Sequence, residues 1–175
     1  MTISFRPLAH DDLALLFEWV HREHVKPWWR PEDTFDEFAR EYVDSVEGRD
    51  PTDVYVVELD GRSIGAIQTY LVADYPEWET LVQVGPGVAG VDLLIGEAEL
   101  VGRGLGPAIL GAFLRDVVFA RADVHACVAG VEPANERSLR AFAKVGFHPV
   151  RDYVEDALPH RLLRIDRQSP ATNLK

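Results

Sequence analysis

The chain has 175 residues, 47% of them hydrophobic, which is the size and composition of one globular domain. We expect that domain over residues 1–167, followed by a flexible tail over residues 168–175. The formal net charge of −11 opposes binding to phosphate backbones and argues against DNA or RNA as a partner. The same acidity can attract polycations, or it can serve solubility alone.

The single cysteine, Cys127, excludes an internal disulfide and fits a reducing environment. No stretch is continuously apolar over the ~18 residues that a membrane helix needs, and the first residues lack the apolar core of a signal peptide. The sequence therefore predicts a cytoplasmic protein without a membrane partner.

The first third of the sequence predicts one strand and two helices. Residues 3–6 alternate apolar and polar side chains, as a half-buried strand does. Apolar residues recur at helical spacing over residues 13–20, and a second amphipathic helix is predicted over residues 34–48. Between these helices, Trp28 and Trp29 lie between two prolines, so we interpret that segment as a loop.

The middle of the chain changes to a two-residue period, which predicts strands. Residues 54–59 and 64–72 flank an Asp-Gly pair, a strong signal for a hairpin. Residues 73–87 hold prolines and several acids without a clear period, so we interpret them as an exposed loop. A further strand is predicted over residues 88–95.

The next segments alternate helix and strand. Residues 96–106 are a glycine-rich connection that leads into an amphipathic helix. The apolar face of that helix is predicted to consist of Ile109, Leu110, Phe113, Leu114 and Val117. Residues 124–131 are rich in valine, as expected for a buried strand.

The last predicted elements are a short helix and a strand pair. Asn135 is expected to cap the helix, which ends at Gly146. Residues 147–154 and 160–165 can form two further strands. The order of elements predicts a mixed α/β fold, in which a meander of strands precedes alternating strands and helices.

The glycine-rich connection carries the clearest chemical signal. Gly102, Gly104 and Gly106 alternate with other residues and open an amphipathic helix. Without Cβ atoms such a loop approaches a ligand closely, and its N–H groups with the helix N-terminus form a cradle for anions, above all pyrophosphate. A P-loop needs Lys and then Ser or Thr, and a dinucleotide site needs the glycines after a first parallel strand. Neither pattern fits this loop. The alternative to an anion-binding loop is a glycine-rich turn that binds no ligand.

The loop, the segment Ile3–Leu8 and the segment Asn135–Phe147 together make the chain resemble a GNAT acetyltransferase. The resemblance covers nearly the whole chain. It implies a mostly antiparallel central sheet of about seven strands flanked by helices, with splayed strands that form the acetyl-coenzyme A cleft. In Trp28-Trp29 and in the segment Pro86–Leu94 the chain is most similar to aminoglycoside 6'-N-acetyltransferases.

The resemblance also implies acetyl-coenzyme A as co-substrate, with its pyrophosphate on the loop amides and its pantetheine or adenosine end near Asn135. The predicted coenzyme-binding residues are Leu93, Leu94, Val101, Gly102, Arg103, Gly104, Leu105, Gly106, Asn135 and Phe142. The family often has Gln or Arg where Val101 stands. Many relatives have a tyrosine that protonates the leaving thiolate where this chain has Phe142. The histidines show no metal-ligand spacing, so no metal site is expected.

Asp92 is the predicted catalytic residue. An ammonium group has no lone pair and must lose a proton before it can attack a thioester. Asp92 belongs to the strand that leads into the phosphate loop. The resemblance implies that this carboxylate binds the acceptor amine and accepts its proton. The alternative is a purely structural hydrogen-bond acceptor.

Aromatic and acidic residues are candidates for binding the acceptor. Trp28 and Trp29 can wall a sugar ring, or they can simply fill the core. The acidic and aromatic residues of segment 73–87 suit a polyamine, or they form a plain solvated loop. The predicted acceptor-binding residues are Trp28, Trp29, Tyr75, Glu77, Trp78, Glu79, Asp92 and Glu132.

Taken together, these features favour acetyl transfer to a primary amine of a small cationic molecule, with an aminoglycoside 6'-amine as the best candidate. One alternative is acylation of a lysine- or hydroxylamine-derived siderophore precursor. Another is a non-catalytic module that only binds acyl-coenzyme A. We expect no nucleic-acid partner and a monomer or homodimer.

Overall fold

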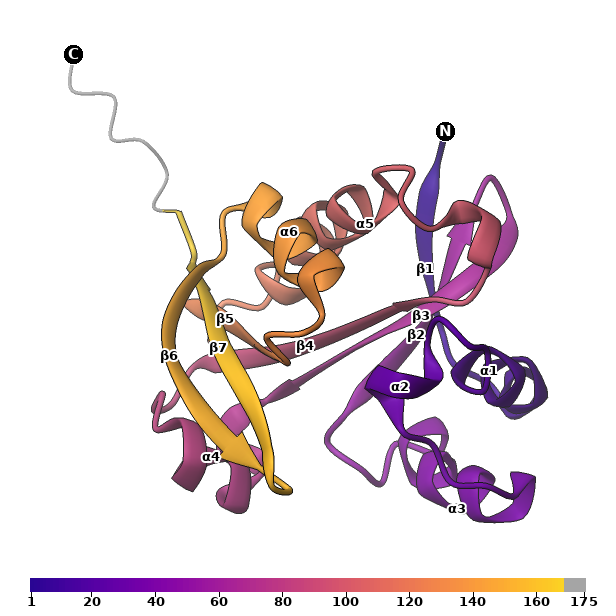
Figure 1. Ribbon diagram of the computed structural model, residues 1–175, viewed down its shortest axis with the longest axis horizontal. Coiled ribbons are helices and arrows are strands. Elements are labelled where there is room, and N and C mark those ends of the chain that lie inside the picture. The colour runs from indigo at the N-terminus through magenta and orange to yellow at the C-terminus, as the bar shows by residue number, and fades with distance from the viewer. Residues whose placement is uncertain (169–175) are drawn as a thin grey trace.

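The computed structural model describes residues 1–168, in which helices lie on both faces of a seven-stranded sheet (Figure 1). The strand order is β1-β2-β3-β4-β5-β7-β6. Strands β4 and β5 are parallel, and every other neighbouring pair is antiparallel. The expected mixed α/β fold with a mostly antiparallel sheet is therefore confirmed. The predicted tail lies outside the described residues, apart from Gln168.

The bounds of the elements follow the sequence pattern closely. The strands are β1 Ile3–Pro7, β2 Asp53–Leu59, β3 Arg62–Leu71, β4 Val88–Ile95, β5 Ala126–Val131, β6 His148–Glu155 and β7 Leu158–Asp166. The helices are α1 Leu13–Val20, α2 Lys26–Trp29, α3 Phe35–Val46, α4 Pro76–Val82, α5 Leu105–Phe113 and α6 Glu136–Val145. In residues 1–168, no helix is both long and apolar enough to cross a membrane.

Local capping explains where α3 and α6 begin. The Thr34 hydroxyl accepts a hydrogen bond from the Glu37 amide (3.4 Å) at the start of α3. The Asn135 side chain accepts one from the Ser138 amide (3.2 Å) at the start of α6, as predicted. Such caps satisfy helix N–H groups that have no partner inside the helix. Gly146 ends α6 with a φ of 106°, a conformation that glycine adopts without strain.

Two segments that were predicted as loops are in fact short helices. Residues Lys26–Trp29 form α2, which Arg30 ends in the left-handed conformation (φ 46°). Within the predicted exposed loop 73–87, residues Pro76–Val82 form α4, with Pro76 in its first turn and Val82 fully buried. Helices of four and seven residues are too short to show a clear apolar period, which is why the sequence pattern missed them.

The helix after the glycine loop ends differently from the prediction. Residues Leu114–Val118 continue α5 as a π-helical turn. The wider turn rotates the chain, so Val118 is buried at 1% exposure, whereas the predicted Val117 is only partly buried. The end of this helix therefore packs into the core mainly through Val118, and not through the predicted Val117.

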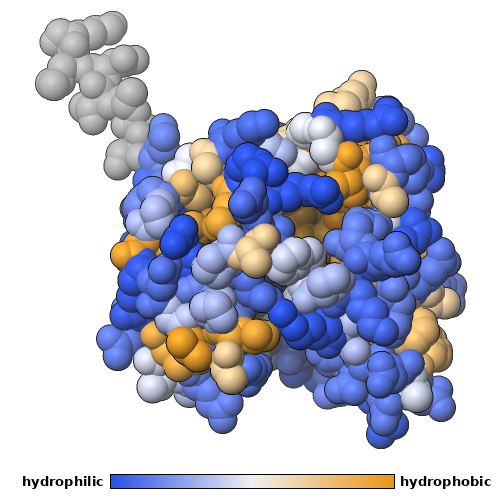
Figure 2. Space-filling view, viewed as in Figure 1, coloured by the Kyte–Doolittle hydropathy of each residue, from blue (hydrophilic) through white to orange (hydrophobic). Residues whose placement is uncertain are grey.

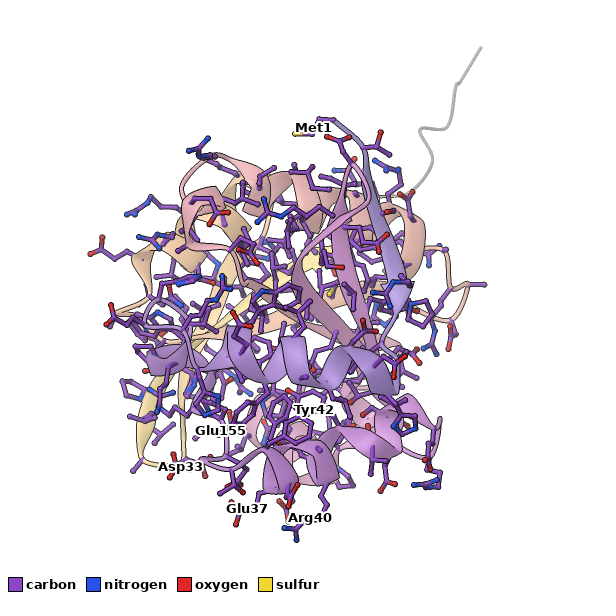
Figure 3. The ribbon with its side chains drawn as sticks, turned by 90° about the vertical axis from the view of Figure 1, so that its right-hand side faces the viewer. Met1, Asp33, Glu37, Arg40, Tyr42 and Glu155 are labelled. Carbon is purple, nitrogen blue, oxygen red and sulfur yellow. The ribbon has the colours of Figure 1, made fainter. Side chains whose placement is uncertain are left out.

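The helices divide between the two faces of the sheet. Helices α5 and α6 cover one face, whereas α1, α3 and α4 cover the other (Figure 1). Seen from the side of α1 and α3, Tyr42 points inward from α3, and Glu37 and Arg40 point outward (Figure 3). Burial agrees, because Tyr42 is 8% exposed and both charged residues are exposed.

The sheet opens between β4 and β5. These parallel strands pair only through Val88, Ala89 and Gly90 of β4. Beyond Gly90 the remainder of β4 has no partner on that side, and the strands diverge. The expected splayed strands are thus present, and they separate the halves of the sheet at the residues with predicted chemical roles.

Candidate active site

Two adjoining cavities lie beside the unpaired part of β4, and the smaller one extends between β4 and β5. The larger has a volume of about 360 Å³ and the smaller about 120 Å³. The residues that line both cavities are Trp28, Trp29, Leu93, Asn135, Ser138 and Phe142. Figure 2 shows a hollow with apolar residues at its bottom beside α6. A ligand in the larger cavity can therefore meet a second ligand in the smaller one.

The glycine loop forms one wall of the larger cavity. Gly102 and Gly104 have φ values of 80° and 79°, a conformation that favours glycine. A Cβ atom added to either residue would have no other group within 4 Å, so the space beside the loop is open. Gly104 immediately precedes α5, whose first N–H groups have no partner within the helix. An open glycine loop at a helix N-terminus fits the diphosphate of coenzyme A.

Most of the predicted coenzyme-binding residues lie together. Those that line the larger cavity are Leu93, Leu94, Val101, Gly102, Gly104, Gly106, Asn135 and Phe142. Arg103 is exposed outside the cavity lining, and the Leu105 side chain is buried in the core. Leu105 can therefore contribute to the site only through its backbone. Gly106 permits close packing of α5 on α6, because an added Cβ would lie 3.4 Å from the Ala141 Cβ.

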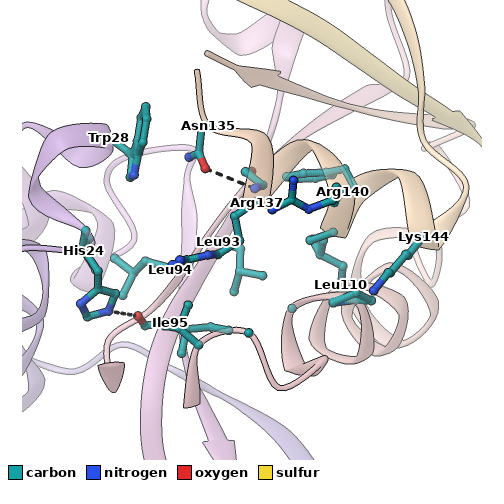
Figure 4. A pocket seen from close by; sticks show the side chains of 18 of the residues that line it. His24, Trp28, Leu93, Leu94, Ile95, Leu110, Asn135, Arg137, Arg140 and Lys144 are labelled. Atoms are coloured by element: carbon teal, nitrogen blue, oxygen red, sulfur yellow. Dashed lines mark hydrogen bonds between the residues drawn. The ribbon is translucent and has the colours of Figure 1, made fainter. Parts of the chain in front are cut away.

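A row of cations on α6 was not singled out from the sequence. Arg137, Arg140 and Lys144 line the larger cavity from α6, and His24 lines it beside Ile95 of β4 (Figure 4). The cations are spaced by three and four residues, which places them on one side of a helix. That spacing, within a helix capped by Asn135, is a signal that could have identified them.

Asp92 lies on the face of the sheet opposite α5 and α6. On that face of β4 it lies between Leu94, which packs in the hydrophobic cluster beneath α1 and α3, and Val88, which packs in the cluster beneath α4. Its carboxylate lines the smaller cavity and accepts a hydrogen bond from the Gln68 amide (3.0 Å) on β3. Desolvation raises the pKa of Asp92, and hydrogen bonds to Gln68 and Tyr70 oppose that shift. A carboxylate with a raised pKa is a stronger base, as proton transfer from an amine requires.

Two tyrosines near Asp92 were not predicted as a pair. Tyr70 lies across Gly90, where an added Cβ would be 2.5 Å from the ring. Tyr153 likewise places its hydroxyl against Gly130, a residue that lines the smaller cavity. Burial raises the pKa of Tyr153 to about 12, and the negative charge of Asp92 contributes. Burial also raises the pKa of Tyr70 well above its ordinary value, so both phenols stay protonated at neutral pH.

Glu132, a predicted acceptor-binding residue, lines the smaller cavity, but its carboxylate has a partner within the chain. Both of its oxygens accept hydrogen bonds from the Arg30 guanidinium, at 2.6 Å and 2.9 Å. The pair lowers the pKa of Glu132. It joins the end of α2 to the end of β5 across the gap, between residues 102 positions apart.

The two tryptophans line the cavities from the α2 side. Trp28 is 38% exposed and borders both cavities. Trp29 also borders both, but its indole N–H donates to the Tyr42 hydroxyl (3.2 Å), which anchors it to α3. Of the two predicted roles, wall and core plug, Trp28 is placed for the wall and Trp29 for both.

The four acceptor-binding candidates of segment 73–87 lie outside both cavities. The Tyr75 hydroxyl donates to Asp50 (2.9 Å) and pairs with Thr52. Glu79 accepts from the Gly85 amide (3.0 Å) at the end of α4, and Glu77 is exposed. Trp78 packs against a buried cluster of valines and against Tyr70. Tyr75 and Glu79 thus have partners within the chain, and Trp78 packs behind Tyr70 and not in either cavity.

Phe142 is buried at 5% exposure and packs edge-on against Phe147, and its phenyl ring carries no hydroxyl that could donate a proton. One turn earlier, Ser138 borders both cavities. In the described part of the chain it is the one residue with a hydroxyl that borders both. Over the same residues, no group of three or more His, Cys, Asp or Glu side chains is arranged to hold a metal ion.

Comparison with known proteins agrees with this geometry. Residues 9–154 match the model of the acetyltransferase (GNAT) domain family. The chain is 30% identical over 151 residues to an aminoglycoside N(6')-acetyltransferase type 1 of Klebsiella pneumoniae, covering 83% of this chain and 74% of the relative. The structure of the aminoglycoside acetyltransferase AAC(6')-Ib in complex with coenzyme A matches with a TM-score of 0.85, 28% identity and 95% of each chain. Its complex with coenzyme A and kanamycin matches with a TM-score of 0.84 at 29% identity, again over 95% of each chain. This chain belongs to the GNAT acetyltransferase family.

Proposed function

We propose that this protein transfers the acetyl group of acetyl-coenzyme A to an amino group of a small cationic acceptor, best an aminoglycoside at its 6'-amine. The observation that carries the proposal is the junction of two cavities. An anion-binding loop borders one of them, and a buried carboxylate borders the other. Relatives that match over most of the chain include proteins named as aminoglycoside 6'-acetyltransferases, which supports the choice of acceptor.

Each part of the site has a separate task in this reaction. Bound acetyl-coenzyme A would supply a thioester that an unprotonated amine can attack. The glycine loop and the N-terminus of α5 would hold the diphosphate, and Leu93 and Leu94 would border the pantetheine arm. Asp92 would bind the acceptor ammonium and take its proton, with its orientation fixed by Gln68.

The acceptor side of the site favours cations. Asp92 lies in the smaller cavity, where its ionised carboxylate would attract an ammonium group. The exposed ring of Trp28 offers an apolar face for a sugar ring or a cation. Because phenylalanine cannot replace a proton-donating tyrosine, Ser138 is the candidate donor to the departing sulfur.

The direct test measures free thiol released from acetyl-coenzyme A in the presence of kanamycin. We expect release with kanamycin and little with an aminoglycoside that carries a hydroxyl in place of the 6'-amine. Asp92→Asn should remove most turnover, whereas Asp116→Asn, a change at an exposed carboxylate outside both cavities, should not.

Two further outcomes would replace the proposal. N-hydroxyputrescine belongs in the acceptor panel, because an N-hydroxyputrescine acetyltransferase of Acinetobacter baumannii is 32% identical over 59 residues, or 34% of this chain. Turnover with that amine alone would indicate a siderophore precursor as acceptor. Binding of coenzyme A without turnover of any amine would indicate a non-catalytic module.

A further inference from the structure

The cation row on α6, defined as Arg137, Arg140 and Lys144, lies on the same cavity as the glycine loop. Figure 4 shows the three side chains one after another along the helix, starting beside Asn135. All three residues line the larger cavity. From Arg137 to Lys144 the helix advances by seven residue steps, or about 10 Å at 1.5 Å per residue.

The row is electrostatically unusual for this chain. Most arginines in residues 1–168 pair with a carboxylate, as expected at a net charge of −11. Arg137 and Lys144 have no carboxylate within 4.0 Å and no hydrogen-bond partner among those residues. Arg140 pairs only with Glu136 (3.2 Å), one turn earlier on the same helix, where both side chains are largely exposed. Such a pair is weak, so the row keeps most of its positive charge for a ligand.

The glycine loop does not use this charge. The open backbone of Gly102 and Gly104 and the first turn of α5 already provide N–H groups for one diphosphate. Coenzyme A carries a second anionic group, a phosphomonoester on its ribose, with a charge of about −1.5 to −2 at neutral pH. Arginine and lysine side chains are the groups that bind such phosphates.

We propose that Arg137, Arg140 and Lys144 bind the 3'-phosphate of coenzyme A and make the protein select coenzyme A over 3'-dephospho-coenzyme A. The inference rests on the proposed function, since it assumes that coenzyme A occupies the larger cavity. It adds to that function a phosphomonoester site on α6 that is separate from the diphosphate loop.

The test compares the two ligands by calorimetry, without any acceptor amine. The wild-type protein should bind coenzyme A at least tenfold more tightly than 3'-dephospho-coenzyme A at low salt. The ratio should shrink as salt is raised, because the contacts lie at the surface. The Arg140→Gln/Lys144→Gln and Arg137→Gln variants should lose affinity for coenzyme A alone, so that the ratio approaches one. Arg115→Gln, a change at an exposed arginine outside both cavities, should leave the ratio unchanged.

The outcomes separate this inference from the proposed function. Equal affinity of the wild-type protein for the two ligands would overturn the phosphomonoester site and leave the acetyltransferase proposal intact. Equal loss of affinity for both ligands in the variants would also overturn it, since the row would then act on the diphosphate or through general charge. Binding of neither ligand by the wild-type protein would overturn the proposed function, and the inference with it.

Discussion

Gly130 leaves space for the Tyr153 hydroxyl at the edge of the smaller cavity. A Cβ atom at Gly130 would lie closer than 3.0 Å to that hydroxyl oxygen, a separation that real Cβ atoms essentially never show. The same Cβ would lie 3.3 Å from Cζ of the ring, which is tight but close to ordinary contact. The clash of Gly130→Ala is therefore with one atom, the phenolic oxygen.

Tyr153 cannot move away freely. Its ring stacks on His160, with centroids 5.3 Å apart, and packs beside the buried cluster that contains Val88 and Val128. Overpacking at such a site typically costs about 1–3 kcal/mol, so Gly130→Ala should lower the free energy of unfolding by that amount. Urea-induced unfolding, followed by circular dichroism, measures the change directly.

A double-mutant cycle tests the cause. In the Tyr153→Phe background the oxygen is absent, so Gly130→Ala should cost much less than in the wild-type background. Gly111→Ala on α5 is the matched control, because its added Cβ has no other group within 4 Å. That control should be neutral or stabilise by up to ~1 kcal/mol. An equal cost of Gly130→Ala in both backgrounds would refute the steric argument.

Three more changes test other parts of the site. Because burial raises the pKa of Asp92, the folded state binds the carboxyl proton more tightly than the unfolded state. The free energy of unfolding therefore falls as the pH rises from the pKa of Asp92 in the unfolded chain through its pKa in the folded protein. Asp92→Asn should therefore raise the melting temperature at neutral pH while turnover is lost, and a lower melting temperature would contradict the burial argument. The partly exposed ion pair with Arg30 lowers the pKa of Glu132. The pair should therefore add about 0.5–1 kcal/mol to the free energy of unfolding at pH values above the pKa of an unfolded glutamate, and this contribution should be lost as the pH falls through the pKa of Glu132 in the folded protein. Glu132→Gln should remove that contribution, and the exchange Arg30→Glu/Glu132→Arg should restore part of it in urea unfolding; no recovery would exclude a simple ion pair. Gly104→Val should weaken coenzyme A binding measured by calorimetry, because the φ of 79° strains a β-branched residue and its side chain would enter the open space beside the loop; unchanged affinity would place the diphosphate elsewhere.

Local sequence patterns were sufficient for most elements that form through near neighbours. The apolar period of α3, the hairpin at Asp60-Gly61 and the Asn135 cap all depend on residues within one turn of each other. The short helices α2 and α4 escaped because four and seven residues do not complete a pattern. The glycine loop was found because its conformation depends on a local absence of side chains, at Gly102 and Gly104.

The sequence by itself determined most of the elements, the open glycine loop and the acid on the strand that precedes it, because each is encoded by residues adjacent in the chain. Only the tertiary structure decided what surrounds them. The gap between β4 and β5 arises because pairing stops after Gly90, and the partner of Glu132 lies 102 residues away at Arg30. Spacing along a chain does not reveal such distant contacts, so burial, charge pairing and the membership of a cavity are fixed only when the sheet assembles.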